Sequence, residues 1–172
     1  MMNEKLEHAK FMAELMYDMF MNEVDSNEDV KVDVVDVANK LGGTVFKRGY
    51  IGVNDNSMRI DKNDGTFEIY VSAMDTEERQ RFTIAHELGH YFMHYLQDKS
   101  ENPETQYYRK SYAEGGQKEY EANVFAASFL MPEREFKKFF DIRNKNLGSV
   151  AKDFGVSIAA AEVRARSLGL LQ

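Results

Sequence analysis

The chain has 172 residues, with 22 basic and 29 acidic side chains, so its formal net charge is −7. This length suffices for one domain with a substantial core. The acidic balance disfavours a general nucleic-acid binder, whose surface would be basic. The absence of cysteine excludes disulfides, thiolate metal sites and cysteine nucleophiles. Any metal must therefore be held by His, Asp or Glu.

The N-terminal residues 3–22 place apolar side chains such as Leu6, Ala9 and Ala13 at helical spacing. They predict an amphipathic helix whose methionines, including Met12 and Met19, widen the packing stripe. Charged residues interrupt this segment, so it lacks the unbroken apolar stretch of a secretory signal. The longest nearly apolar run, "VFAASFLM", is too short to cross a bilayer. We therefore expect a cytoplasmic protein.

The next part of the chain changes from helical to strand-like patterning. "VDVVDVANKLGG" predicts a short helix that is capped by Asp33 and stopped by Gly42 and Gly43. "TVFKRGYIGV", "SMRID" and "TFEIYV" are strand-like and are separated by turn sequences. They predict a meander of three antiparallel strands. The last of them is the expected edge strand, against which an extended peptide could lie.

A longer helix is predicted from Asp75 to about Leu96, with Glu78 completing an aspartate variant of the capping box. Residues 97–116 are polar and contain a proline and a Gly-Gly pair. They predict a long loop, which in a compact domain is usually functional or disordered. A further helix is predicted over residues 117–131, and it ends at Pro132.

The first of these two helices contains "HELGH", which matches the H-E-x-x-H pattern of zinc peptidases. His86 and His90 are four residues apart, so they project from one face of a helix and can reach one ion. Glu87 lies about 100° round the helix from His86, close enough to reach a water at the metal without binding the metal itself. So short a pattern also has a plain explanation, an amphipathic helix with two ordinary histidines.

The third ligand distinguishes the classes of zinc peptidase. A metzincin would need glycine and histidine where this chain has Met93 and Leu96, so that class is excluded. His94 continues the spacing of four, but it lies about 12 Å from His86 along a helix axis. One straight helix cannot place three such residues round a tetrahedral ion. We therefore expect His94 to support the site or the core rather than to bind metal.

The second helix offers Glu119 and Glu121. Glu119 shares a face with small residues, Ala122, Asn123 and Ala126, which would allow a neighbouring helix to approach closely. Glu121 points nearly the opposite way. A buried carboxylate is costly unless a cation binds it, so Glu119 is the predicted third ligand. Asn123 is expected to hold the free ring nitrogen of a ligand. The alternative for Glu119 is a solvated glutamate at a helix start.

Together, "RFTIAHELGHYFMH" and "EYEANVFAASFLMP" resemble the ImmA/IrrE family of metallopeptidases, and the similarity extends over roughly residues 30–172. The resemblance implies a zincin-like α+β fold in which a three-stranded sheet packs on the zinc-binding helix. It also implies that Zn2+ is bound by His86, His90 and Glu119, with Glu87 as the catalytic base.

The implied chemistry is peptide hydrolysis, in which zinc acidifies a water and Glu87 takes its proton. A second group that stabilises the oxyanion is usual at such sites. The candidates are Tyr107, Tyr108, Tyr112 and His94, each of which also has a structural explanation.

The C-terminal stretch "SVAKDFGVSIAAAEVRARSLG" has helix-turn-helix spacing, with its turn at Gly155. Residues 143–172 carry five basic and two acidic side chains, a local charge of +3. We expect this pair to pack on the catalytic core or to dock a protein substrate; DNA binding is the alternative, and +3 is a weak footprint for it. The predicted domains are thus a zinc metallopeptidase domain, residues 1–142, and a helix-turn-helix-like subdomain packed on it, residues 143–172.

Two hypotheses for function follow. The first is an intracellular zinc endopeptidase of narrow specificity; by resemblance, its substrate would be a helix-turn-helix repressor whose cleavage derepresses mobile-element or stress genes. The second is a regulatory binding module that acts through its C-terminal helices on DNA or on a protein. Glu87 favours the first, because a scaffold does not need it.

Overall fold

The computed structural model describes residues 2–21, 30–49, 56–61, 64–96, 106–108 and 116–171. Its helices are α1 (Met2–Met21), α2 (Val34–Lys40), α3 (Glu77–His90), α4 (Gln117–Leu130), α5 (Glu133–Ile142), α6 (Leu147–Phe154) and α7 (Ile158–Ser167). A π-helical turn, η1 (Tyr91–Tyr95), continues α3. The strands are β1 (Gly43–Arg48), β2 (Asn56–Ile60), β3 (Phe67–Ser72) and β4 (Gln106–Tyr108). No helix in this part of the chain has the length and apolarity of a membrane span.

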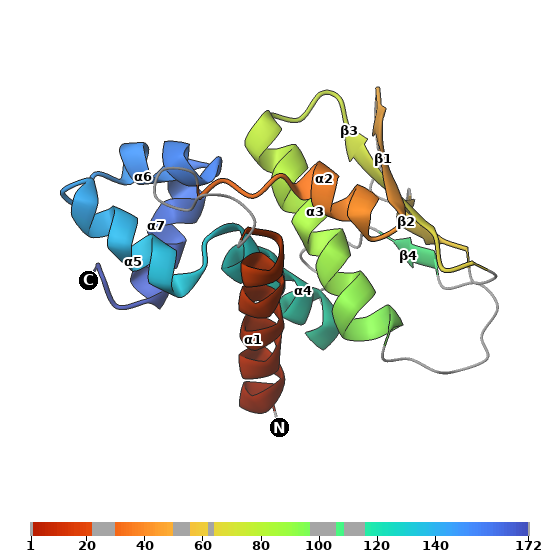
Figure 1. The fold of residues 1–172 in the computed structure, drawn as a ribbon, viewed down its shortest axis with the longest axis horizontal. Coiled ribbons are helices and arrows are strands. Elements are labelled where there is room, and N and C mark those ends of the chain that lie inside the picture. The colour runs from red at the N-terminus through yellow and green to blue at the C-terminus, as the bar shows by residue number, and fades with distance from the viewer. Residues whose placement is uncertain are drawn as a thin grey trace.

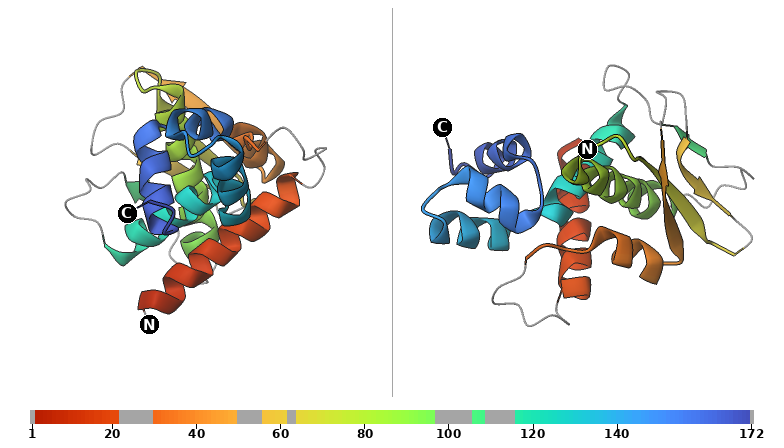
Figure 2. Two further views of the ribbon diagram at one scale, coloured as in Figure 1. Left: turned by 90° about the vertical axis from the view of Figure 1, so that its left-hand side faces the viewer. Right: turned by 90° about the horizontal axis from the view of Figure 1, so that it is seen from above.

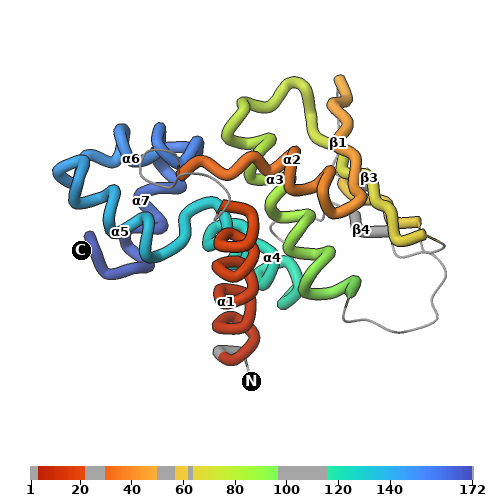
Figure 3. The backbone as a smooth tube through the Cα atoms, viewed as in Figure 1, coloured from red at the N-terminus to blue at the C-terminus, as the bar shows by residue number. Residues whose placement is uncertain are grey.

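The fold is α+β, with the sheet at one side of the molecule and α5, α6 and α7 at the other (Figures 1 and 2). Helices α3 and α4 run between these two parts and pack against each other. Helix α1 packs against α4, and the tube drawing shows it extending away from the rest of the chain toward the N-terminus (Figure 3).

The sheet has four strands in the order β1-β3-β2-β4. Strand β1 is parallel to β3, and β2 is antiparallel to both β3 and β4. The predicted three-stranded antiparallel meander is therefore wrong in strand number, order and direction. The fourth strand comes from the segment that was predicted to be a long loop.

Strand β3 lies at the centre of the sheet, so the prediction that it forms an edge is wrong. Its alternating residues Phe67, Ile69 and Val71 are buried, and so is Tyr70 on the other face. Burial of side chains on both faces is typical of a strand inside a sheet rather than at its edge. The edges are instead β1, which packs against α2, and β4.

The caps of the first two internal helices show where local signals succeed and fail. As predicted, Asp33 caps α2, because its Oδ1 accepts hydrogen bonds from the backbone N–H groups of Val35 and Asp36, each at 3.0 Å. Helix α3, in contrast, is capped by Thr76 and not by Asp75. The backbone of Asp75 belongs to the preceding turn, where its carbonyl accepts from Gln80 Nε2 at 3.0 Å. The predicted Asp75 capping box is therefore wrong.

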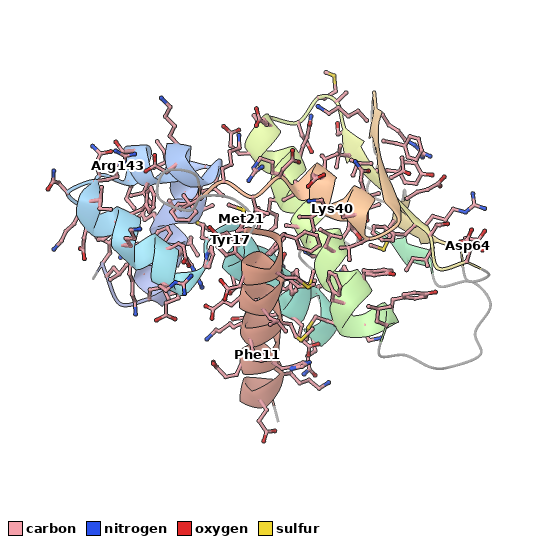
Figure 4. All side chains as sticks on the ribbon, viewed as in Figure 1. Phe11, Tyr17, Met21, Lys40, Asp64 and Arg143 are labelled. Carbon is pink, nitrogen blue, oxygen red and sulfur yellow. The ribbon has the colours of Figure 1, made fainter. Side chains whose placement is uncertain are left out.

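Helix α1 confirms the predicted N-terminal helix and buries Ala9, Ala13 and Met16. Met19 does not widen the packing stripe, since it is 57% exposed. Figure 4 shows Tyr17 and Met21 at the end of α1 near the middle of the molecule. The Tyr17 hydroxyl there donates to the carbonyl of Val30 at 3.3 Å, which ties α1 to the chain that leads into α2.

The C-terminal part contains the two helices expected on either side of Gly155, preceded by α5, which was not predicted. Helix α5 buries Phe136, Phe139 and Phe140, an i, i+3, i+4 pattern that the sequence displays. Phe136 and Phe139 pack on Phe154 of α6. Arg143 lies at the outer end of this cluster, far from Asp64 at the sheet end (Figure 4).

Two buried arginines join the C-terminal helices to the centre of the molecule. Arg81 of α3 donates to the carbonyls of Val32, Phe154 and Gly155 at 2.9, 3.3 and 3.0 Å. Arg164 of α7 donates from Nε to the carbonyl that ends α4, at Met131, at 2.9 Å. The carbonyls of Phe154, Gly155 and Met131 lie at helix C-termini, where positive charge is stabilised, and Val32 precedes α2.

Candidate metal centre

Close packing between α3 and α4 creates the site. A Cβ atom on Gly89 would lie 3.2 Å from Cα and O of Ala122, so the glycine lets the two backbones nearly touch. Ala122 and Ala126 are fully buried on the facing side of α4. The small residues that the sequence placed on one face with Glu119 thus allow the approach that was expected, and Glu119 reaches the histidines of α3.

Three potential ligand atoms converge at this contact. The Nε2 atoms of His86 and His90 are 3.1 Å apart, and they lie 3.3 and 3.1 Å from the two carboxylate oxygens of Glu119. Ligands about 2.0–2.1 Å from a tetrahedral zinc would be about 3.3 Å from one another. The three predicted ligands therefore have the spacing that one zinc ion requires.

The other ring nitrogens are held by neighbouring side chains. His86 Nδ1 is 2.9 Å from Asn123 Oδ1, which can only accept, so this nitrogen carries a proton. The expected role of Asn123 is thus present in the geometry. His90 Nδ1 is 3.0 Å from His94 Nδ1. With both Nδ1 atoms protonated in neutral rings, the two Nε2 lone pairs and a carboxylate face one point, an arrangement that calls for a cation.

The directions in which the pKa values of His86 and Glu119 are shifted also indicate a point between them that attracts positive charge. Burial lowers the pKa of His86, but its hydrogen bond to Glu119 and the charges of Glu87 and Glu119 outweigh it and raise this pKa above the ordinary value. Burial likewise raises the pKa of Glu119, but hydrogen bonds from His86 and His90 bring it far below the ordinary value. A proton or a metal ion is therefore stabilised between these groups.

Glu87 is placed beside this point and is 3% exposed. Its Oε2 atom is buried and has no hydrogen-bond partner among the described residues. A buried carboxylate oxygen without a partner is costly, so the position is poised for a donor such as water or substrate.

Glu121 and His94 form a pair behind the site. Glu121 is 4% exposed, and its Oε2 lies 3.0 Å from His94 Nε2, so the glutamate that was expected to point away supports His90 through His94. Burial lowers the pKa of His94, although its hydrogen bond to Glu121 opposes this. A neutral His94 can accept from His90 Nδ1 and donate from Nε2 to Glu121. The sequence showed one further acid in the second motif, but the burial of His94, which requires such a partner, is seen only in the structure.

These contacts do not identify the second group that was predicted to stabilise the oxyanion. His94 has both ring nitrogens engaged and is buried, so it is not free to meet a substrate. Tyr107 and Tyr108 belong to β4, but their side chains lie outside the described residues, as does all of Tyr112.

The chain is similar to a known peptidase family in sequence and to a solved structure in fold. A family model described as the IrrE N-terminal-like domain (Peptidase_M78) matches residues 38–166. Among solved structures, a Mycobacterium tuberculosis transcriptional regulator superposes with a TM-score of 0.55 at 16% identity, over 87% of this chain and 44% of that chain. The chain therefore spans less than half of that regulator, and the likeness concerns the fold. No curated protein matches the sequence significantly.

Proposed function

The chain belongs to the IrrE N-terminal-like peptidase family, and from this membership we propose that it is a zinc-dependent endopeptidase of narrow specificity. The observation that carries the proposal is the convergence of His86, His90 and Glu119 at zinc-ligand spacing beside Glu87. His86, His90 and Glu119 would hold the ion. When bound, zinc supplies Lewis-acid chemistry, because it acidifies water and polarises a peptide carbonyl.

Glu87 would be the general base. Its unpartnered Oε2 can accept the proton of the attacking water and then deliver it to the amine that leaves. A scaffold that only bound metal would gain nothing from this buried carboxylate, so the orphaned oxygen favours a peptidase over a binding module.

Asn123 and the His94–Glu121 pair would orient the ligands. Asn123 contacts Nδ1 of His86, and His94, which Glu121 holds, contacts Nδ1 of His90. These contacts keep the Nε2 atom of each metal-binding histidine free for the metal. The π-helical turn that follows His90 carries His94. Such turns recur at functional sites.

An extended peptide would add to the sheet at β4, the edge strand that does not pack against α2. Strand addition uses the unpaired backbone groups of an edge, which β3 lacks because both its sides are paired. The proposed peptide-binding edge is therefore on a different strand from the one that the sequence suggested.

The C-terminal helices favour contact with protein rather than DNA. Three of their five basic side chains are already engaged, because Arg143 pairs with Asp153, Arg166 pairs with Glu162, and Arg164 is buried. The exposed large hydrophobic side chains of α7 are Ile158 and Val163. Phosphate binding needs free cations, so a protein partner suits this surface better.

By family resemblance the substrate would be a helix-turn-helix repressor in the cytoplasm. The decisive test is to incubate the zinc-loaded protein with a purified repressor encoded beside it, together with the Glu87→Gln variant. Cleavage by the parent protein and none by Glu87→Gln would support the proposal. Intact repressor in both reactions would oppose it.

A further inference from the structure

A groove of about 900 Å3 lies between four helices, α1, α3, α4 and α7. Its walls are mainly apolar. They include Leu6 of α1, Phe82 of α3, Val124 and Ala127 of α4, and Ala160 and Val163 of α7. Residues four apart on α7, Ala159, Val163 and Ser167, all line it, so one wall follows the helix axis.

Two residues that line the groove contact His86 of the candidate metal centre. Phe82 lines it, and the ring of Phe82 lies 6.4 Å from the ring of His86. Asn123 also lines it and contacts His86 Nδ1 at 2.9 Å. A chain that lies in the groove therefore passes close to His86.

Arg164 contributes a buried positive charge to the lining. The residue is 7% exposed, and its Nε donates to Met131 O. Its two terminal nitrogens have no hydrogen bond or ion pair within the described parts of the chain. Burial lowers the pKa of Arg164, and the more distant charges of Glu133 and Glu14 oppose this. A guanidinium with two unused donors in an apolar groove matches a carboxylate.

We propose that the groove binds an apolar segment of the substrate protein that carries one carboxylate side chain, which pairs with Arg164. The inference rests on the proposed peptidase function and names how its substrate is recognised. Helix α1, whose Leu6 and Lys10 line the groove, lies outside the residues that match the family model. This wall of the groove therefore comes from outside the matched family domain. Binding energy from such a remote segment aligns the scissile bond.

The test uses the full chain with Glu87→Gln, loaded with zinc, as bait for a library of random peptides of about 16 residues, which span about 24 Å as a helix. The inference predicts that the enriched peptides share apolar residues and an Asp or Glu. Adding Val163→Arg should weaken their binding at least about tenfold, because it places a charge at the groove wall. Ile158→Arg is the matched control, since both side chains are exposed on α7, at 58% for Ile158 and 68% for Val163, and only Val163 lines the groove.

The carboxylate is tested by a double-mutant cycle. Replacing the acidic residue of an enriched peptide by its amide should weaken binding about tenfold on the parent bait and less than about twofold on a bait with Arg164→Gln. An equal loss on both baits would overturn the pairing. The cycle remains informative if Arg164→Gln lowers stability, because each peptide pair is compared on one protein.

Other outcomes would contradict either the proposed role of the groove or the proposed function. Peptides that bind equally to the Val163→Arg bait would overturn the inference, and so would a dimer that Val163→Arg disrupts and Ile158→Arg preserves. Binding of octanoate without any groove-dependent peptide would overturn it in favour of a small carboxylate. Groove-dependent peptide binding by a protein that cleaves no repressor would contradict the proposed function alone. Equal repressor cleavage by the Val163→Arg and Ile158→Arg variants, made with Glu87 intact, would contradict the groove alone.

Discussion

Arg81 of α3 donates a hydrogen bond of 3.0 Å from Nε to the carbonyl oxygen of Gly155, in the turn between α6 and α7. Gly155 has a φ of +63°, and a Cβ atom there would lie 3.0 Å from Arg81 Nε and 2.5 Å from Lys31 Cε. The helix that carries both histidines is thus joined directly to the C-terminal helices.

Replacing Arg81 should therefore destabilise the whole molecule. Arg81→Met leaves three carbonyl groups without their donor, and we expect the free energy of unfolding to fall by about 3 kcal/mol. Urea unfolding measures this change. Arg79→Met, at an exposed position of the same helix, is the control and should change it by less than about 0.5 kcal/mol. Equal effects of the two substitutions would refute this role of Arg81.

Glu119→Ala should remove bound zinc, because it deletes one of three ligands. Glu121→Ala should keep zinc but lower its affinity by about 10- to 100-fold, since His94 then loses the partner that orients it. This revises the expectation that Glu121 has no part in metal binding. Zinc content after dialysis, followed by competition with a chromophoric chelator, separates the two effects. Lys118→Ala, at an exposed position, is the control. Full zinc in Glu119→Ala would exclude this ligand.

Glu87→Gln should keep the fold and the zinc but lower repressor cleavage by about 10²- to 10⁴-fold. The amide preserves the shape of the side chain but cannot take the proton of water. Circular dichroism and zinc content verify the first part, and cleavage rates the second. Turnover at the parent rate would mean that another group is the base.

Gly89→Ala should separate α3 from α4. The new Cβ atom would lie 3.2 Å from backbone atoms of Ala122, and it would also lie 3.2 Å from Cβ of Phe125. None of these atoms is a flexible chain end, so we expect a loss of about 1–3 kcal/mol in stability. Zinc affinity should fall with it, because Glu119 moves away from the histidines. An Ala variant with parental zinc affinity would show that the contact can relax.

The stability of the metal-free protein should depend on pH through His86 and Glu119. The pKa of His86 is raised above 6.5, so its contribution is complete below that pH and is lost as the pH rises through the folded value. The pKa of Glu119 is lowered below 4.5, so its contribution is complete above that pH and is lost as the pH falls. The interaction between His86 and Glu119 should therefore stabilise the metal-free folded protein most between pH 4.5 and 6.5.

Urea midpoints of the metal-free protein at about pH 5.5 and about pH 8.5 measure this contribution. The midpoint should be lower at the higher pH, and Glu119→Gln should reduce the difference. A difference that Glu119→Gln leaves unchanged would assign the pH dependence to other groups.

The sequence alone indicated the helices other than α5, the pair His86 and His90, and Glu87 beside them. These features are local, because a spacing of four residues on one helix determines which side chains share a face. It also selected Glu119, since the small residues of α4 marked the face that could approach a neighbouring helix. Here too the signal was periodic within one element.

Only the tertiary structure decided the order of the strands, the contact of Glu121 with His94, and the hydrogen bonds that join Arg81 to the C-terminal helices. Glu121 meets His94 across 27 positions, and Arg81 meets Gly155 across 74. Neither contact leaves a periodic trace in the chain, because its geometry depends on how whole elements pack. The same holds for β3, whose central place comes from its pairing with β1 on one edge and with β2 on the other.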